Sequence, residues 1–315
     1  MIRILMIVIA CIAALTAACG SPETGNPSVR DSSGAAAPDI QMDWKALDQA
    51  MGRAGTMMAG NVYRFGMPRG DLQVTVAGVR VKPALALGSW IAFKARSGGA
   101  IAMGDLVLLE SEVGPVLSRL QAGGIEQTAV HHHVLNETPR IVYVHIHAHG
   151  NALRIAGGVR EALALTGTPP AATGAVPAGE TGIDTARIAA TLGFTGKVNG
   201  GVYQVSVPRA ETIHDGGEAI PPSMGLGTAL NFQPTGGGKA AITGDFVMIA
   251  TEVNAVIRSL RESGIEVTSL HNHLLEEEPR LFFMHFWAND NALKLARGLR
   301  AALDVTNSQR GTRAP

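Results

Sequence analysis

The histidines of this sequence are concentrated in two short windows. Ten histidines are present, and only His214 lies outside these windows. The windows contain His131, His132, His133, His145, His147 and His149, and then His271, His273 and His285. Histidine is the commonest metal-ligating side chain, and histidines scattered over a surface would not gather in this way. The two windows are therefore the first candidates for a functional site.

The same spacing of ligand residues, H-x-H-x3-E-x7-H, occurs once in each window. The residues concerned are His131, His133, Glu137 and His145 in the first window, and His271, His273, Glu277 and His285 in the second. Three imidazoles and a carboxylate suit a divalent transition metal. Zinc is the foremost candidate, and manganese, iron and copper accept the same ligands. We expect one metal site in each window.

Strand alternation predicts how these side chains are presented. Val142, Val144 and Ile146 form an apolar row that should face covering helices, so the intervening row, which contains His145, should point the other way. His131 and His133 share one face of the preceding strand by the same rule. The three histidines then project from one face of a hairpin, if the turn register permits. A solvated histidine face, or a set of hydrogen-bonded structural histidines, remains the alternative.

Four further charged residues recur near the windows: Asp105, Asp245, Arg140 and Arg280. Each aspartate follows a glycine inside an expected strand. This pattern indicates a β-bulge that either aims a carboxylate at the site or is a plain irregularity. Each arginine follows a proline in the turn. These arginines are candidates for binding an anionic ligand or for a salt bridge to Glu137 or Glu277.

The two windows belong to an internal duplication. Residues 104–166 align with 244–306 at a constant offset of 140, with 28 identities in 63 positions. The aligned segments predict strands at 101–110, 125–134 and 141–148, and again at 241–250, 265–274 and 281–288. Helices are expected after Ser111 and Thr251 as caps, and after Asn151 and Asn291. Glu112 and Glu252 then fall in the first helical turn, where a carboxylate favours the helix dipole.

The order of elements predicts the fold class. We expect an α+β protein of two tandem repeats, each with a mainly antiparallel sheet and helices on one face. The core is β-α-β-β-α and the arrangement ferredoxin-like. Residues 60–66, 71–81 and 89–95 should add short strands upstream of this core.

Composition suggests where the repeats begin and end. Residues 167–182 are rich in Pro, Gly and Ala and predict a linker between repeat domains at 41–166 and 183–308, followed by a tail at 309–315. The repeats should be separate compact units. A joint core would instead prevent the halves from folding alone.

The N-terminal segment predicts export and lipidation. Residues 1–18 contain Arg3 and an uncharged apolar run at 4–15, as a signal peptide does. The following string LTAAC resembles a lipobox ending at Cys19, with Thr16 where leucine is usual. Residues 19–40 would then be a lipidated flexible tether. A plain signal peptide or a short membrane anchor is the alternative.

Composition also excludes several classes of function. The only cysteines are Cys11 and Cys19, so a mature lipidated chain has neither a disulfide nor a free thiol. The formal net charge is zero, which gives no support for a nucleic-acid partner. Neither a nucleophile elbow nor a phosphate loop is present.

Two long strings carry a family resemblance. GDLVLLESEV with GGIEQTAVHHHVLNETPRIVYVHIHAHGNAL, and GDFVMIATEV with GIEVTSLHNHLLEEEPRLFFMHFWANDNAL, resemble the LppY/LpqO family of bacterial lipoproteins over essentially the whole mature chain. The resemblance implies a lipoprotein of the cell envelope and this domain type, but no particular activity.

Two functional hypotheses follow. The first is an envelope lipoprotein that binds divalent metal in its histidine hairpins, either as a metal-dependent hydrolase or as a metal handler. The second is a non-catalytic binding or scaffolding module of the envelope with a structural histidine face. Its partners would be the membrane, through Cys19, and an envelope ligand that the sequence does not name.

Overall fold

The computed structural model describes residues 42–171 and 181–311. The expected signal peptide, lipidation site and tether, most of the linker and the end of the tail lie outside the described residues. No helix in the described ranges is long and apolar enough to cross a membrane.

The first repeat is built on a six-stranded antiparallel sheet with the order β1-β2-β5-β6-β9-β7. Its elements are α1 (Trp44–Met51), β1 (Thr56–Met58), β2 (Val62–Pro68), β3 (Thr75–Val76), β4 (Val79–Arg80), α2 (Pro83–Ala86), β5 (Gly88–Arg96), β6 (Gly99–Leu109), α3 (Glu110–Ala122), β7 (Glu126–His131), β8 (Glu137–Thr138), β9 (Ile141–Gly150) and α4 (Ala152–Leu163).

The second repeat has the equivalent sheet, in the order β10-β11-β14-β15-β17-β16. Its elements are α5 (Thr185–Leu192), β10 (Lys197–Asn199), β11 (Val202–Val207), β12 (Ile213–Asp215), β13 (Glu218–Ile220), the 3-10 turn η1 (Pro222–Met224), β14 (Thr228–Gly236), β15 (Lys239–Met248), α6 (Val253–Glu262), β16 (Glu266–His271), β17 (Phe282–Asn291) and α7 (Ala292–Leu303).

The expected fold class is confirmed, with one change of connection. β9 lies between β6 and β7 and is antiparallel to both, so β6, α3 and β7 form a split β-α-β unit. In a ferredoxin-like sheet the strand on the far side of β6 would follow the last helix. Here that place is taken by β5, which comes earlier in the chain.

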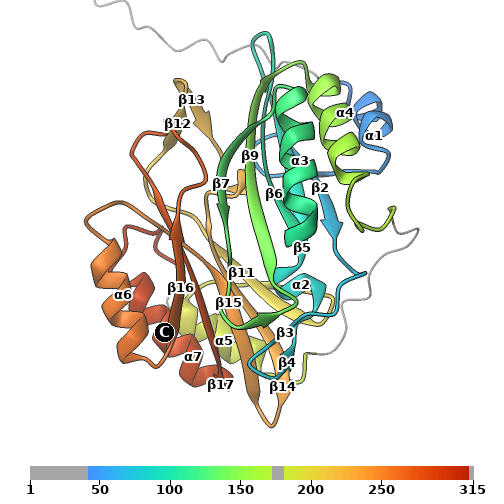
Figure 1. Ribbon diagram of the computed structural model, residues 1–315. Helices are drawn as coiled ribbons and strands as arrows, with labels where there is room; N and C mark the ends of the chain where they lie inside the picture. The colour runs from blue at the N-terminus through green and yellow to red at the C-terminus, as the bar shows by residue number, and fades with distance from the viewer. Residues whose placement is uncertain (1–41, 172–180, 312–315) are drawn as a thin grey trace, which may run out of the picture. The chain divides into compact units, whose positions relative to one another are not determined.

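Helices cover one face of each sheet, as the strand alternation predicts (Figure 1). Val142, Val144 and Ile146 of β9 are buried in a cluster with residues of α1, α3 and α4. Asn151 and Asn291 begin α4 and α7, and each side chain accepts a hydrogen bond from a backbone amide of the first helical turn. Ser111 and Thr251 are not the caps we expected, because α3 already begins at Glu110 and α6 begins only at Val253.

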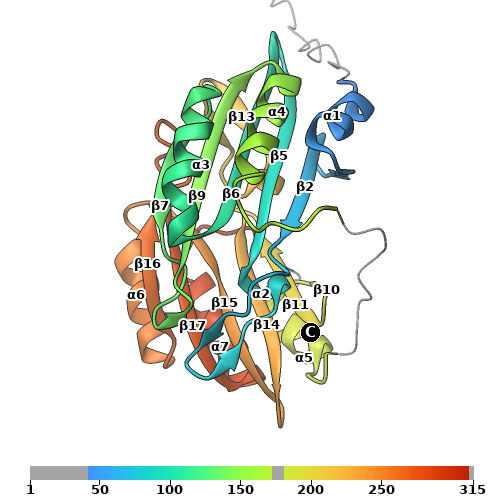
Figure 2. The ribbon, with the colours of Figure 1, turned by 45° about the vertical axis from the view of Figure 1, so that its right-hand side comes forward.

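The helix-free faces of the two sheets are buried against each other (Figure 2). One hydrophobic cluster joins Ile101 and Met103 of the first repeat to Val247 and Phe283 of the second. A second cluster includes Tyr143 from the first repeat and Trp287 from the second. The expectation of separate compact units is therefore wrong, because the described residues of both repeats belong to one compact unit.

In each repeat, hydrogen bonds of a buried arginine and its glutamate partner connect the sheet to the segment that follows the last helix. Arg209 is 2% exposed and donates hydrogen bonds to the Val247 carbonyl (2.9 Å), to Glu252 (2.7 Å) and to Glu211 (2.7 Å). Glu252 also accepts from the Asn307 amide (2.6 Å), beyond α7. In the first repeat, Arg69 binds Val107, Glu112 and Asp71 in the same way, and Glu112 accepts from Gly167. The two glutamates thus have a more specific role than favouring a helix dipole.

We predict that Arg209→Met destabilises the protein by about 3–5 kcal/mol, because it leaves the buried carboxylate of Glu252 without its counter-charge. Arg258→Met removes the same charge from an exposed position on α6 and should change the free energy of unfolding by less than about 0.5 kcal/mol. Urea unfolding followed by circular dichroism measures both variants. Equal effects in the two would refute the role given to Arg209.

The same networks predict a loss of stability in acid. Burial opposes ionisation of Glu112 and Glu211, but hydrogen bonds from Arg69 and Arg209 outweigh it and lower both pKa values below 4.5. A carboxyl pKa that is lower in the folded state stabilises the protein above the unfolded value, and this contribution disappears as the pH falls through the folded value. Thermal melts should therefore drop below about pH 4.5, and Glu211→Gln should flatten that drop.

The shared core predicts that the repeats do not survive separation. A cut within 167–182 should leave both halves associated, because the clusters between the sheets still hold them together. Residues 183–315 expressed alone would expose Val247, Phe283 and Trp287 to water and should aggregate or bind a hydrophobic dye. Size-exclusion chromatography of the nicked protein and of the single repeat measures this. A monomeric, cooperatively folding single repeat would contradict it.

Candidate metal centre between the repeats

Strand register places one aspartate beside one histidine in each repeat. Asp105 of β6 lies opposite His145 of β9, and Asp245 of β15 lies opposite His285 of β17. The pairing runs through these positions without a shift, so the bulge expected at each aspartate is wrong. The preceding Gly244 is needed for a close approach instead, because a Cβ there would lie 1.8 Å from the Ala229 carbonyl oxygen.

Register shifts lie next to the other histidines, in the edge strands β7 and β16. Each of these two strands carries one irregularity, between Gln127 and Ala129 in β7 and between Val267 and Ser269 in β16. The residue inside each shift is a threonine that reaches the other repeat. Thr128 donates to the His273 carbonyl (2.6 Å) and Thr268 to the His133 carbonyl (2.5 Å).

These contacts bring the two histidine windows together into one group, which we call the central cluster. It contains Asp105, His131, His133, His145, Asp245, His271, His273 and His285. Five of its members are at most 9% exposed, namely both aspartates, His145, His273 and His285. The histidine face is therefore covered by the opposite repeat, and the alternative of a solvated face is excluded.

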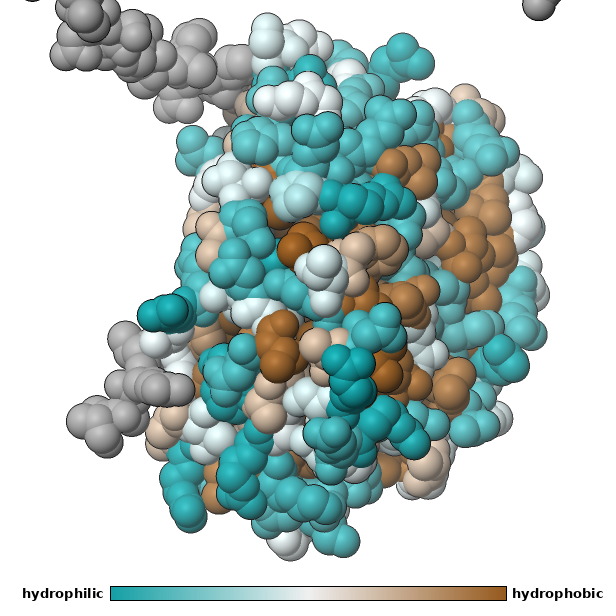
Figure 3. Space-filling view, turned by 90° about the vertical axis from the view of Figure 1, so that its left-hand side faces the viewer, coloured by the Kyte–Doolittle hydropathy of each residue, from teal (hydrophilic) through white to brown (hydrophobic). Residues whose placement is uncertain are grey.

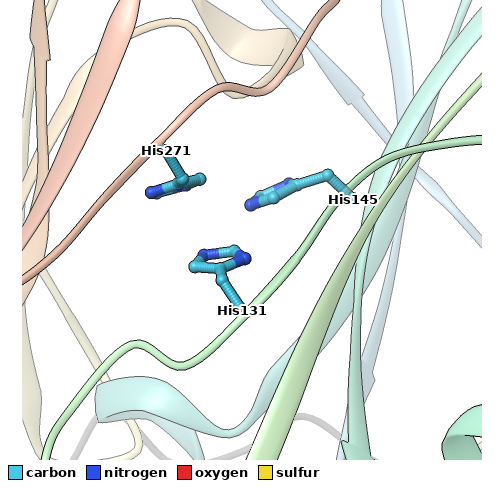
Figure 4. Close-up of side chains that lie close together, drawn as sticks. All are labelled: His131, His145 and His271. Atoms are coloured by element: carbon cyan, nitrogen blue, oxygen red, sulfur yellow. The ribbon is translucent and has the colours of Figure 1, made fainter.

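The closest imidazole pairs in the cluster cross between the repeats. Ring centroids are 3.8 Å apart for His131 and His271, 3.7 Å for His133 and His285, and 4.0 Å for His145 and His273. Figure 4 shows His131 and His145 of the first repeat with His271 of the second, turned toward a common space. We expected one site per hairpin, but the structure brings residues of both hairpins together in one place.

Several subsets of the cluster have metal-ligand geometry. The subsets are His131, His145 and His271; His131, His133 and His285; Asp105, His133 and His145; and Asp245, His271 and His273. Within each, one nitrogen or carboxylate oxygen per residue lies within 4.8 Å of the others. The Nε2 atoms of His131 and His285 are 3.4 Å apart, which is close to the separation of about 3.5 Å expected for two nitrogens on one zinc ion.

Backbone carbonyls fix which ring nitrogen faces the cluster. His285 Nδ1 lies 2.6 Å from the Gly244 oxygen, and His273 Nδ1 lies 3.0 Å from the Gly225 oxygen. A carbonyl can only accept, so these Nδ1 atoms carry the proton and each Nε2 presents a lone pair. A backbone carbonyl on the outer ring nitrogen is the usual support of a metal-ligating histidine.

Many polar atoms of the cluster are buried without a hydrogen-bond partner. They are Asp105 Oδ1, His131 Nδ1, His133 Nε2, His145 Nε2, Asp245 Oδ1, His273 Nε2 and both ring nitrogens of His271. An unpaired buried polar atom costs roughly 1–3 kcal/mol, and native proteins have few of them. So many in one place make the cluster a candidate ligand-binding site.

Burial also keeps the imidazoles neutral. Desolvation, together with the neighbouring rings, lowers the pKa of His131 to about 3. The same causes lower the pKa of His133, His145 and His271. Since a neutral imidazole is the form that binds a metal ion, the cluster is ready to bind at neutral pH.

Glu137 and Glu277 are placed differently from our expectation. Glu137 accepts a hydrogen bond from the Ile141 amide (3.0 Å), and Glu277 accepts one from the Leu281 amide (2.8 Å). Each glutamate therefore closes the turn of its own hairpin. Burial raises the pKa of Glu137 to about 7 and that of Glu277 above its usual value. Neither belongs to a candidate ligand group of the described residues.

Arg140 and Arg280, which lie in equivalent turns, have different partners. Arg280 lies 3.3 Å from Glu277, as the salt-bridge interpretation predicts. Arg140 instead donates to His132 Nε2 (2.7 Å), and His132 donates from Nδ1 to the Ile141 carbonyl (2.6 Å). His132 is therefore a structural histidine, and in the second repeat Asn272 stands in its place.

Three members of the cluster, His131, His133 and His271, are partly exposed. His131 lines an open hollow of about 350 Å³ together with Glu110, Val113, Val130, His132 and Val142. Val130 of β7 and the equivalent Leu270 of β16 are about half exposed, because both strands are sheet edges. On the face drawn in Figure 3, apolar residues lie in small groups among polar ones.

Comparisons with curated proteins and with solved structures give no functional relative. No curated protein matches the chain. Two solved structures are similar to it at very low identity. The trimeric bacterial microcompartment shell protein PduB has 12% identity and a TM-score of 0.21, covering 81% of this chain and 95% of its own. EtuB from Clostridium kluyveri has 8% identity and a TM-score of 0.20, covering 82% and 96%. These scores support no inference about function.

A family model matches each repeat once, at residues 45–165 and at residues 186–305. Together the two matches cover most of the chain, and each includes one complete histidine window. The chain therefore belongs to the family described as Domain of Unknown Function (DUF1259), of which it carries two copies.

Proposed function

We propose that this protein binds a divalent transition metal in the central cluster, and that the two repeats hold it jointly. Zinc is the foremost candidate, because imidazole nitrogen with carboxylate oxygen is a ligand set it prefers. The observation that carries the proposal is the set of buried, unpaired nitrogen and oxygen atoms facing one space. A cation would satisfy these atoms together and would neutralise the carboxylates of Asp105 and Asp245.

The number of ligands is consistent with more than one ion. The cluster has eight side chains, and a tetrahedral zinc ion takes about four ligands. Asp105 with His133 and His145, and Asp245 with His271 and His273, would each contribute three ligands to a separate ion. His131 and His285 are then available as fourth ligands. We accordingly expect up to two ions in the cluster.

Metal binding should be measurable in two ways, as uptake of the ion and as a rise in the stability of the protein. Protein purified without an affinity tag and stripped with chelator should take up zinc in isothermal titration calorimetry. At a free concentration of about 100 Kd, binding should stabilise it by about 2.7 kcal/mol, which is several degrees in melting temperature. His133→Gln with His271→Gln should weaken central binding at least tenfold, because every candidate ligand group of the cluster then lacks one ligand.

A matched control separates ligand histidines from structural ones. His214→Gln changes an exposed histidine outside the cluster and should leave zinc binding unchanged. If the central histidines are ligands, the double variant should lose the stabilisation by zinc while its metal-free melting temperature changes little. A large loss of metal-free stability, with no zinc uptake by the unaltered protein, would support the non-catalytic module with a structural histidine face.

We also propose that the chain is exported and anchored in the cell envelope through lipid on Cys19, as a lipoprotein similar to the LppY/LpqO family. The LTAAC string and the apolar run before it support this. Two or three acyl chains attach a protein stably, at roughly 0.8 kcal/mol for each buried CH₂ group. The membrane would be its partner, and the linked domain would stand at the membrane surface.

Fractionation tests the anchor. The unaltered protein should sediment with membranes and be released by detergent, whereas Cys19→Ala should be soluble or remain unprocessed. Cys11→Ala is the matched control, since Cys11 lies inside the expected signal peptide and its loss should change nothing. Full processing and unchanged membrane attachment of Cys19→Ala would refute the proposal.

A further inference from the structure

A second group of ligand residues lies outside the central cluster, at another junction between the repeats. His147 and His149 follow His145 on the same face of β9, and Asp215 ends β12 of the second repeat. The Asp215 Oδ2 atom lies 2.9 Å from His147 Nε2 and 3.4 Å from His149 Nε2. The three residues thus offer two nitrogens and one oxygen around a common point.

The closest two of these atoms pair only imperfectly. His147 Nε2 lies 2.9 Å from Asp215 Oδ2 in an ion-pair contact, but the two groups are not oriented for a well-formed hydrogen bond, and both atoms are buried. Both side chains are less than a tenth exposed. A nitrogen and a carboxylate oxygen that converge in this way are also the arrangement found around a bound cation. Burying a poorly paired nitrogen and oxygen would otherwise cost free energy.

The duplication provides an internal comparison. At the positions of His147 and His149, the second repeat has Trp287 and Asn289. The equivalent hairpin of the first repeat, β3 and β4, has Val76 where β12 and β13 have Asp215. Trp287 and Val76 belong to the same buried hydrophobic cluster. The repeats thus meet at two equivalent junctions. Apolar side chains fill one of them, and potential metal ligands occupy the other.

We propose that His147, His149 and Asp215 form a second site for a divalent transition metal ion, independent of the central cluster. Two histidines and one carboxylate are the protein ligands of many metal sites that keep open coordination positions. His149 is 36% exposed, so water can reach the ion and complete its coordination. This site would therefore exchange its metal more readily than the buried central cluster.

Arg96 of β5 would oppose metal binding at this site. Its guanidinium lies 2.7 Å from His149 Nδ1 and can only donate, so the remaining proton of a neutral His149 is on Nε2. Binding a metal through Nε2 requires that proton on Nδ1, and Arg96 must then turn away. Glu218, whose carboxylate is 3.9 Å from Arg96 Nε, offers the guanidinium another partner. Arg96 thus weakens the site without being a ligand.

The test counts bound metal in variants of the full-length chain. In the His133→Gln, His271→Gln background, in which every candidate ligand group of the central cluster lacks one ligand, calorimetric titration with Zn²⁺ should still show about one equivalent at this second site. Adding His147→Gln with Asp215→Asn should weaken this binding at least tenfold. His214→Gln, which changes the exposed neighbour of Asp215, should leave it unchanged. Circular dichroism and a thermal melt confirm that each variant is folded.

The outcomes separate this site from the central one. Equal Zn²⁺ uptake with and without His147→Gln and Asp215→Asn would overturn the second site and leave the central proposal intact. Zinc uptake by the unaltered protein that depends on His147 and Asp215 alone would support the second site and refute the central one. Arg96→Gln should bind zinc more tightly. Unchanged or weaker binding in that variant would overturn the ligand role of His149 Nε2.

Discussion

The burial of two polar sheet faces against each other is the constraint on which this structure depends. A sheet with helices on one side normally leaves its other face to water. Here each sheet turns histidines and an aspartate toward the other repeat, and apolar residues such as Met103 and Phe283 close the junction around them. Burying polar atoms is favourable only when they find partners. Some find them in Gly244 and Gly225 carbonyls, and the rest point into a shared space.

This constraint explains why the duplication matters. One repeat alone would present three imidazoles and a carboxylate on an open surface, where water would satisfy them. Two hairpins face to face remove the water and raise the cost of every unpaired nitrogen. The crossing hydrogen bonds of Thr128 and Thr268, each placed by a register shift in an edge strand, hold the hairpins at this distance. The candidate binding centre is thus a property of the pair of repeats.

Much of the fold could be predicted from the sequence because it is set by local periodicity. The alternation of Val142, Val144 and Ile146 with His145 gave the correct helix-facing row, and Asn151 gave the correct start of α4. The partner of the histidine face could not be predicted in this way. Which surface covers a sheet depends on contacts between residues about 140 positions apart, and alternation within one strand carries no such information. Asp215 was missed for the same reason, since its hairpin joins the site only through the packing of the repeats.

Other residues that the sequence analysis missed could have been found by comparing the two repeats. Arg69 and Arg209 both follow a proline and precede an acidic residue by two positions, at the repeat offset of 140, and each is nearly inaccessible to solvent. A charged residue that recurs in both copies among apolar neighbours indicates a buried pair, and Glu112 and Glu252 recur at the same offset as its partners.

Positions that differ between the two copies show which residues the common fold does not determine. His147 and Trp287 occupy the same place in a common backbone, so the fold of the repeat does not dictate either residue type. At this junction, side chains that can bind a metal replace apolar ones on both contributing strands at once. Ligand binding explains such a replacement better than a gain in stability does.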